Sequence, residues 1–228
     1  MTRTTGSVVA CRGASRTFGR GVTEVVAVDG ITCQVRAGQR IALTGESGSG
    51  KSTLLHLLAG LDAPTTGTVD WPALTVRDGR PKGVGVVFQA PSLVPALDVT
   101  DNVALPLLLA GVAEPVARER ALRALTDLEL LELAPAFPDE LSGGQGQRVV
   151  IARVLAGGPA LVLADEPTGQ LDHRTGGHVL DVLLHAVAEL GAALVVSTHD
   201  PSVAERLPDR WAMTDGHLLN AAAGAALR

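Results

Sequence analysis

The stretch GESGSGKST at residues 45–53 fits the pattern Gly-x-x-x-x-Gly-Lys-Ser/Thr of a phosphate-binding loop. The apolar segment 40–44 before it predicts a buried strand, and the segment 54–59 after it predicts a helix, which is the setting this motif requires. Glycine-rich backbone curls N–H groups around anionic oxygens, and the helix N-terminus adds partial positive charge. We expect Lys51 to reach the β- and γ-phosphates of a nucleoside triphosphate and the Ser52 hydroxyl to hold Mg²⁺. A glycine-rich turn without a ligand is the alternative.

The length and composition fit an α/β protein. The chain has 228 residues, of which 46% are hydrophobic, and this length allows one domain or one core domain with a small inserted lobe. No apolar run reaches the roughly 18 residues that a membrane-spanning helix needs. The apolar excess instead fits strands buried on both faces, as in a parallel sheet. We therefore expect a protein that does not itself cross the membrane.

The charge and the cysteine content indicate which class of partner and which cellular compartment to expect. The net charge is −5, and charges of both signs are spread along the chain. The lack of a basic block argues against nucleic acid as the main partner. Cys11 and Cys33 have no metal-ligand spacing and fit reduced, structural thiols in a cytosolic protein.

The segment before the phosphate loop is predicted to form a small edge sheet. Apolar runs at 8–11, 25–28 and 31–35 indicate short strands, separated by turn signals that include Gly13 and the pair at 29–30. Phe18 follows the first of these strands. A purine base needs a flat apolar partner, so Phe18 is a candidate for stacking on it, and a packing role is the alternative.

A second buried strand is predicted at 83–89 and ends in Gln89. Open α/β sheets place ligand contacts at the carboxyl ends of their strands, so Gln89 is a candidate ligand residue, with an ordinary loop residue as the alternative.

From residue 90 to residue 140 the strand patterns stop. Thr100 is predicted to cap a helix that ends before Gly111, and Pro115 to open a second helix whose apolar side includes Val116 and Leu122. We expect a helical lobe inserted into an α/β core.

Two later stretches present further anion- and metal-binding chemistry. LSGGQ at 141–145 opens a helix with Ser142 at its N-cap, which predicts a second phosphate-binding helix start or a well-capped helix. LVLADE at 161–166 is an apolar strand that ends in two acids, the Walker B arrangement. Asp165 is expected to hold Mg²⁺ through water and Glu166 to polarise an attacking water. His199 follows the next buried strand, where it either donates to a γ-phosphate or is an ordinary loop histidine.

The order of these motifs resembles the nucleotide-binding subunit of an ATP-binding cassette (ABC) transporter over about residues 8–219. GESGSGKST matches Walker A, LSGGQ the family signature and LVLADE Walker B. Gln89 matches the Q-loop, Leu171-Asp172 the D-loop and His199 the switch histidine, and Phe18 lies where the family has its adenine-stacking aromatic. The signature between Walker A and Walker B is the most specific of these matches.

The resemblance implies a P-loop NTPase fold: an α/β core with a mainly parallel sheet, an N-terminal antiparallel β subdomain and an inserted α-helical signature subdomain. It implies one ABC ATPase domain over 1–228, with the core at about 8–89 and 157–219 and the helical subdomain at about 90–156. The implied catalytic residues are Lys51, Gln89, Glu166 and His199, and the implied Mg²⁺ ligands are Ser52, Gln89 and Asp165. The implied nucleotide contacts are Phe18, Gly45, Glu46, Ser47, Gly48, Ser49, Gly50, Lys51, Ser52, Thr53, Ser142, Gly143, Gly144, Gln145 and Asp172.

The resemblance also implies partners. Two subunits pair head to tail, so that ATP bound by Walker A of one is closed over by Ser142 and Gly144 of the other. Gln89 links the Mg²⁺ site to an integral membrane permease that docks near 89–110, on the inner face of the cell membrane, and Asp172 communicates across the dimer. No nucleic-acid partner is expected.

Within the family, the segments VVFQAPSLVPALDVTDNVALPLLLAGV and LADEPTGQLD are similar to the LolD/MacB-type group of lipoprotein-release and macrolide-export ATPases. Gly146 departs from the glutamine usual after the signature, and the segment 67–89 is short for this group. Two alternatives to a transport motor are a permease-like complex that signals without transporting and, less favoured, a soluble ABC protein acting on ribosomes or DNA.

Overall fold

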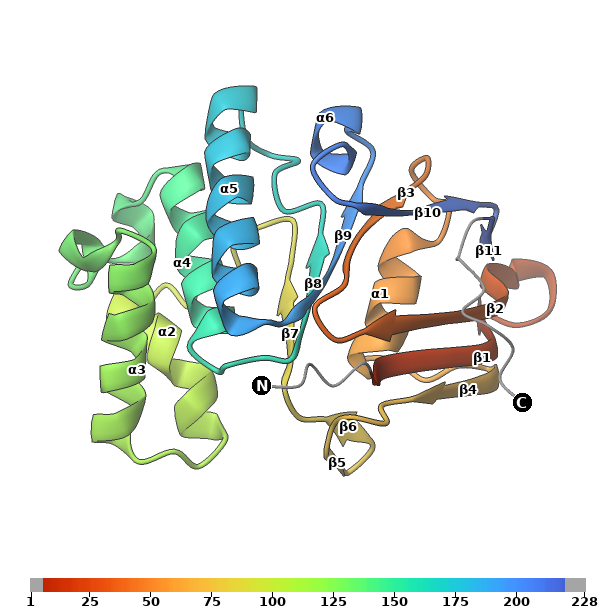
Figure 1. Ribbon diagram of the computed structural model, residues 1–228, viewed down its shortest axis with the longest axis horizontal. Helices are drawn as coiled ribbons and strands as arrows, with labels where there is room; N and C mark the ends of the chain where they lie inside the picture. Colours follow the sequence, from red (N-terminus) through yellow and green to blue (C-terminus); the bar gives the residue numbers. More distant parts are fainter. Residues whose placement is uncertain (1–5, 220–228) are drawn as a thin grey trace.

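The computed structural model describes residues 6–219, and its centre is a six-stranded sheet in the order β11-β10-β3-β9-β8-β7 (Figure 1). All neighbouring strands of this sheet run parallel except the β10–β11 hairpin. The strands are β3 Arg40–Thr44, β7 Val84–Val87, β8 Leu161–Asp165, β9 Ala193–Thr198, β10 Asp209–Thr214 and β11 His217–Leu218. The predicted α/β fold with a mainly parallel sheet is confirmed.

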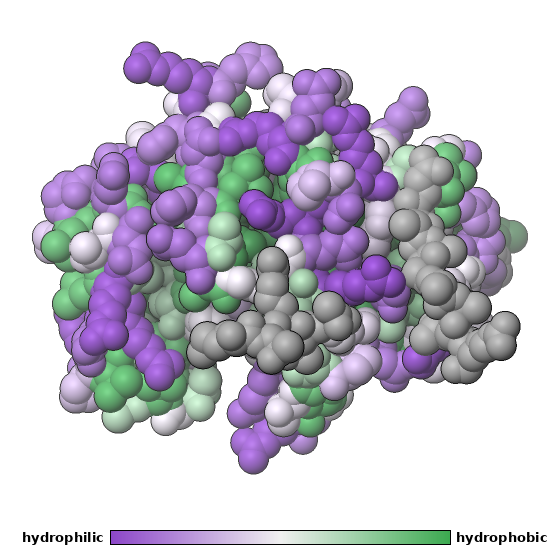
Figure 2. All heavy atoms as spheres, viewed as in Figure 1, coloured by the Kyte–Doolittle hydropathy of each residue, from purple (hydrophilic) through white to green (hydrophobic). Residues whose placement is uncertain are grey.

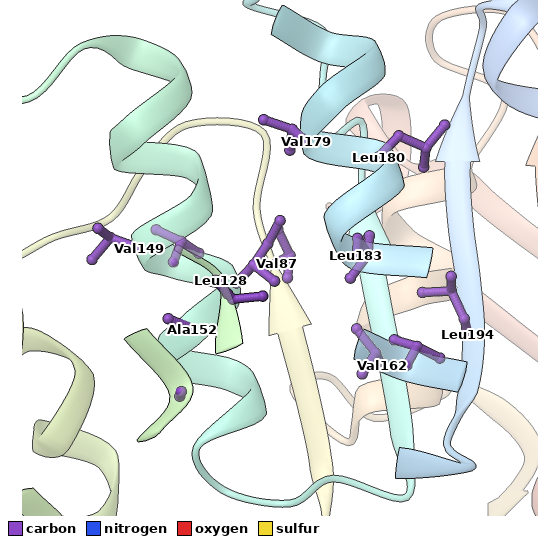
Figure 3. Packing of buried hydrophobic residues seen from close by; sticks show 14 of the residues in the cluster. Val87, Leu128, Val149, Ala152, Val162, Val179, Leu180, Leu183 and Leu194 are labelled. Atoms are coloured by element: carbon purple, nitrogen blue, oxygen red, sulfur yellow. The ribbon is translucent and has the colours of Figure 1, made fainter. Parts of the chain in front are cut away.

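Successive side chains of the central strands pack into two separate hydrophobic cores, one on each face of the sheet. Ile41 and Leu43 of β3 face the first core, together with helix α1 and the N-terminal strands, whereas Ala42 between them faces the second core, together with α2–α5. Val162 and Leu194 from β8 and β9 likewise belong to the second core, together with Leu183 and Val179 of α5 (Figure 3). A strand that is buried on both faces reads as a continuous apolar run, which explains why these segments showed no alternation of polar residues.

An antiparallel sheet in the order β2-β1-β4 covers α1 on the first face (Figure 1). Its strands are β1 Ser7–Phe18, β2 Val25–Arg36 and β4 Thr66–Asp70, and the two-stranded β5–β6 hairpin (Val76–Arg77, Arg80–Pro81) follows. The prediction of separate strands at 25–28 and 31–35 was wrong. Gly13 and Gly30 have φ of +57° and +58° inside continuous strands whose register shifts there, so the glycines accommodate bulges and not chain reversals.

The helices that cover the second face come mainly from the region between β7 and β8. The described helices are α1 Lys51–Ala59, α2 Val99–Leu109, α3 Glu114–Asp127, α4 Gly143–Leu155, α5 His173–Leu190 and α6 Pro201–Ala204, with short 3-10 turns at Gly21–Thr23, Leu131–Leu133 and Pro138–Glu140. In the described part of the chain, none of these is both long and apolar enough to cross a bilayer.

The predicted cap of α2 was wrong by two residues. Asp98, not Thr100, is the N-cap, and its carboxylate accepts from the Asp101 N–H at 2.7 Å. Thr100 is buried, and its hydroxyl instead donates to the Ala134 carbonyl at 3.0 Å.

Helix α3 begins at Glu114, one residue before the predicted Pro115, and part of its expected apolar side is exposed. Val116 is 41% and Leu122 38% exposed, because Ala117, Ala121 and Leu125 form the face that packs on the neighbouring helices.

Candidate active site

The phosphate loop bridges the end of β3 and the start of α1, as the sequence predicted. Gly50 is the N-cap of α1, with φ +98°. A Cβ at this position would lie 2.1 Å from the Ala27 carbonyl oxygen of β2, so only glycine lets the loop pass so close to the antiparallel sheet. The loop is further held by the Gly216 N–H, which donates to the Ser49 carbonyl at 3.1 Å.

Lys51 is the first residue of α1 and is buried, with its ammonium folded back over the loop. Its Nζ donates to the carbonyls of Gly45 (2.8 Å) and Glu46 (2.7 Å). An ammonium has three donors, and these bonds use two, so among residues 6–219 one donor is left for an anion. The buried Ser49 hydroxyl also lacks a partner within the described residues. Both groups fit a loop whose hydrogen bonds are completed by a ligand.

A cavity of about 350 Å³ lies directly against this loop. It is lined by Ala27, Ser47, Gly48, Gly50, Lys51, Ser52, Thr53, Gln89, Asp165 and Glu166. The structure therefore brings Gln89, which follows β7, and the two acids at the end of β8 to the phosphate loop after β3. These side chains meet because parallel strands end at the same edge of the sheet.

The two acids are held in different ways. The Ser197 hydroxyl of β9 donates to the Asp165 carboxylate, and the Glu166 N–H donates to the Ser197 carbonyl at 3.1 Å. Glu166 itself has φ +44°, a left-handed conformation that is strained for a residue with a side chain and is concentrated at functional sites. Its Oε2 lies 3.0 Å from His199 Nδ1. The backbone of Glu166 thus departs from the strand conformation, and His199, which follows β9, contacts its carboxylate.

Glu166 and His199 also line a second cavity, of about 280 Å³, beside the first. Asp172 lies at its edge and is the N-cap of α5, where its carboxylate accepts from the Arg174 and Thr175 N–H groups at 3.1 Å. Hydrogen bonds from Thr175 lower the pKa of Asp172 below its ordinary value. Asp172 is therefore a structural cap as well as the D-loop residue of the sequence pattern.

The start of the signature helix α4 lines neither cavity. Ser142 is its N-cap, and the Ser142 hydroxyl and the Gln145 side chain form a capping box over the first turn. Ser142 and Gly143 are exposed, whereas Gly144 is buried against Thr175 of α5. None of residues 142–145 lines the cavity at the phosphate loop.

Phe18 ends β1 and lies opposite Val25, two residues before the cavity-lining Ala27 on β2. Its ring is 42% exposed, and the Arg16 guanidinium carbon lies 4.6 Å from the ring centroid on one face. Arg16 is in turn fixed by Asp62 at 2.8 Å. The ring does not line the phosphate cavity, whereas Ala27, two residues after its cross-strand partner Val25, does.

The donor set suits Mg²⁺ bound together with a nucleotide. Ser52, Gln89 and Asp165 contribute oxygen atoms around one cavity, and hard oxygen ligands few in number are typical of Mg²⁺ sites that also use substrate phosphates. Among residues 6–219, no cluster of three or more His, Cys, Asp or Glu side chains is placed to hold a metal by itself, so the site fits a metal that arrives with phosphate oxygens.

Sequence reasoning missed Ser197. Its signal was a hydroxyl residue near the end of the otherwise apolar strand β9, but only the pairing of β8 with β9 shows that it lies opposite Asp165.

The arrangement defines a P-loop nucleoside triphosphatase: a mainly parallel sheet, a glycine loop before a helix that starts with a buried lysine, and two acids at the end of another strand of the same sheet. A family model described as ABC transporter matches residues 28–169. The chain is 42% identical over 222 residues to an ABC transporter ATP-binding protein of Mycobacterium tuberculosis, covering 94% of this chain and 90% of the relative. It is 41% identical to the lipoprotein-releasing system ATP-binding protein LolD of Legionella pneumophila, covering 89% and 93%.

Among solved structures, the fold is similar to the ATP-binding cassette MJ0796 in a dimeric post-hydrolysis state bound to ADP and Pi. The TM-score is 0.79 at 33% identity, and the match covers 93% of this chain and 97% of that one. The chain belongs to the ABC transporter family and is an ATP-binding subunit with ATPase activity.

Proposed function

We propose that the chain hydrolyses ATP in a head-to-tail dimer and thereby drives a separate membrane permease. One observation carries the proposal. The signature helix start is built for an anion but lies outside the phosphate cavity of its own chain. A capped, exposed helix N-terminus with two glycines meets a phosphate only if a second copy supplies it. The similar cassette MJ0796, which was solved as a dimer with ADP and Pi, supports the proposal of a dimer.

In the proposed mechanism each side chain has a separate task. Lys51 places its remaining donor on the β- and γ-phosphates, and the loop backbone cradles them. Glu166 polarises the attacking water, and His199, at 3.0 Å from its carboxylate, orients that carboxylate and braces the γ-phosphate. Mg²⁺, held through Ser52, Gln89 and Asp165, would supply charge neutralisation at the phosphates. Phe18 stacks on the adenine with the ring face that Arg16 leaves open.

The permease is proposed to dock near residues 89–110. This part of the chain exposes apolar side chains: Val94 is 36%, Leu108 37% and Leu109 80% exposed. Figure 2 shows green surface gathered at the lower left, over the helices α2 and α3. Exposed apolar side chains fit contact with a protein partner. With the LolD relatives in view, we place the subunit on the inner face of the cell membrane.

Replacement of the general base tests the mechanism. Glu166→Gln is expected to keep ATP binding and to lower turnover by about 10²–10⁴-fold, because general-base catalysis is lost. The variant should accumulate as an ATP-bound dimer in gel filtration. Near-normal turnover would contradict the role of Glu166.

The head-to-tail geometry has its own test. Ser142→Arg places a long cation where the second copy's phosphate is proposed to bind. The double variant Glu166→Gln/Ser142→Arg should therefore stay monomeric with ATP. A fluorescent nucleotide should still bind each monomer. A dimer that persists in the double variant counts against the sandwich.

Co-purification of a polytopic membrane protein from membranes checks the permease; capture of ribosomes or nucleic acid instead would refute it.

A further inference from the structure

The segment between β4 and β7 contains a hairpin with a basic tip. Its strands β5 and β6 are joined by Asp78 and Gly79, which have φ of +52° and +73°. Positive φ at both central residues is the geometry of a type I′ turn, for which Asp-Gly is a preferred pair. This turn fixes the register of the two strands, and Arg77 lies directly opposite Arg80.

Three cations share one face of this hairpin. Side chains alternate between the two faces along a strand, so Lys82 lies on the same side as Arg80 and its partner Arg77. The Lys82 N–H donates to the Thr75 carbonyl at 2.8 Å, which extends the hairpin by one pair. All three cationic residues are exposed. A cavity of about 440 Å³ at the tip is lined by Arg77, Asp78, Arg80, Pro81 and Lys82.

The other face of the hairpin packs against the body of the protein. A Cβ at Gly60, the C-cap of α1, would lie 2.5 Å from Pro81 Cδ and 3.3 Å from Trp71 Cζ2. The Trp71 indole N–H in turn donates to the Leu58 carbonyl of α1 at 2.8 Å. Because Pro81 alternates with Arg80 along β6, its contact with α1 directs the cationic face away from the protein.

This arrangement of charges is unfavourable without a counter-charge. Like charges directly opposite each other on neighbouring strands destabilise the pair. Among residues 6–219 the salt bridges involve other side chains. Asp78 offsets one of the three positive charges, so the tip has a net charge of +2. An anion bound between Arg77 and Arg80 would offset their repulsion, and guanidinium groups are well suited to phosphate oxygens.

We propose that the hairpin tip, residues 76–82, binds the phosphate headgroups of anionic membrane lipids. Figure 1 shows β5 and β6 projecting from the lower edge of the molecule, at which the turn between α2 and α3 also lies. Val76 of the hairpin is 47% exposed, and Leu109 at the end of α2 is 80% exposed. Apolar side chains thus accompany the cations at this edge, and a membrane surface offers phosphates next to acyl chains.

A lipid headgroup fits the tip better than a nucleic acid does. Binding to a duplex takes cations that follow many successive phosphates, whereas the tip offers three cations around one cavity and the whole chain has a net charge of −5. Lipid binding goes beyond the proposed drive of a permease, because it needs neither ATP nor the permease. The hairpin precedes β7, and Gln89 follows the other end of that strand.

Sedimentation of the full-length protein with lipid vesicles tests the proposal. One set of vesicles contains phosphatidylglycerol and phosphatidylcholine in equal parts, and the other set contains phosphatidylcholine alone. The hairpin variant is Arg77→Gln/Arg80→Gln/Lys82→Gln, in which the cationic face is neutral. A gel shift with duplex DNA at the same salt concentration examines the competing class of partner.

The matched control removes the same number of positive charges from α3, as Arg118→Gln/Arg120→Gln/Arg123→Gln. In wild type, Arg118 pairs with Asp101 and Arg123 with Glu119. The control thus changes the net charge equally and leaves the hairpin intact. Both variants should keep wild-type turnover of ATP without vesicles, because none of the replaced side chains lines the phosphate cavity.

We expect wild type to sediment with the phosphatidylglycerol vesicles at low salt and to be released at high salt. Each cation near an anionic surface strengthens binding about 5-fold, so the hairpin variant should lose about 100-fold in its partition onto these vesicles. The α3 variant should stay close to wild type. Since the repulsion between Arg77 and Arg80 is gone, the hairpin variant should have a Tm no lower than that of wild type.

Three results would overturn the proposal: wild type that does not sediment with the phosphatidylglycerol vesicles, equal losses in the hairpin and α3 variants, or a DNA shift that the hairpin variant abolishes while the vesicles stay unbound. A failure of the proposed function would appear elsewhere, as near-normal turnover in Glu166→Gln or a missing ATP-bound dimer. Neither of those measurements involves vesicles.

Discussion

Substitution of Gly144 in the signature is predicted to separate two helices that now touch. A Cβ at Gly144 would lie 2.4 Å from Thr175 Cγ2, whereas carbon atoms in contact lie about 3.5–4.0 Å apart. Helices α4 and α5 must therefore move apart by about 1 Å, or Thr175 must rotate. Rotation is opposed because the Thr175 side chain interacts with Asp172 and lowers its pKa.

The magnitude follows from two opposing effects. Overpacking of a tight contact costs about 1–3 kcal/mol, and alanine in place of glycine in a helix returns about 0.5–1 kcal/mol. We expect Gly144→Ala to lower the free energy of unfolding by about 1–2 kcal/mol net, which is a fall in Tm of about 3–6 °C for a chain of this length. Turnover should fall as well, because the signature helix and Asp172 no longer keep their spacing.

A second-site change gives the sharpest test. Thr175→Ser removes the clashing Cγ2 and keeps the hydroxyl that faces Asp172. In that background Gly144→Ala should become stabilising by about 0.5–1 kcal/mol, so the double-mutant cycle must be strongly non-additive. Gly143→Ala is the control, since its Cβ would meet only the end of Leu171 at 3.4 Å. Denaturant unfolding of the four proteins measures the cycle; additive effects would refute the packing argument.

Three further predictions concern stability and reactivity. Asp98→Ala should lower the free energy of unfolding by about 1 kcal/mol in denaturant titration, because α2 loses its N-cap. Hydrogen bonds lower the pKa of Asp172 in the folded state. The stability that the ionised Asp172 contributes is therefore present above its unfolded pKa of about 3.9 and is lost as the pH falls through its folded pKa. The Tm difference between wild type and Asp172→Asn should disappear in acid and persist at neutral pH. Interaction with the Cys33 thiol and burial raise the pKa of Cys11, so neither cysteine should react with an aromatic disulfide reagent at pH 8 until denaturant unfolds the protein.

The phosphate loop and the strand and helix on either side of it were predictable because their signals are local. A glycine pattern between an apolar run and a helix is complete within about fifteen residues, and its chemistry depends on residue types at fixed spacing. The acids after β8 were predictable for the same reason. Their partner Ser197 was not, because the bond to Asp165 spans 32 residues and depends on which strand lies beside β8.

Local signals failed where a distant partner changed the role of a residue. Thr100 and Asp98 are both acceptable helix caps by type. The choice was made by the Ala134 carbonyl, 34 residues away, which takes the Thr100 hydroxyl. Gly30 has the sequence neighbours of a turn, but pairing of β1 with β2 on both sides keeps the strand continuous. Pairing and register, which act over long separations, thus decide between a bulge and a turn.

The packing of α4 limits how the signature can move. Val149, Val150, Ile151 and Ala152 are each fully buried and belong to the same core as Val162 of the sheet (Figure 3). A sideways shift of the helix would open a cavity beside these side chains, which close-packed cores resist. Near its start the helix is held as well, because a Cβ at Gly144 would lie only 2.4 Å from Thr175 Cγ2 of α5. A tilt of α4 against α5 would disturb that contact too, so we expect the start of α4 and the start of α5 to move together.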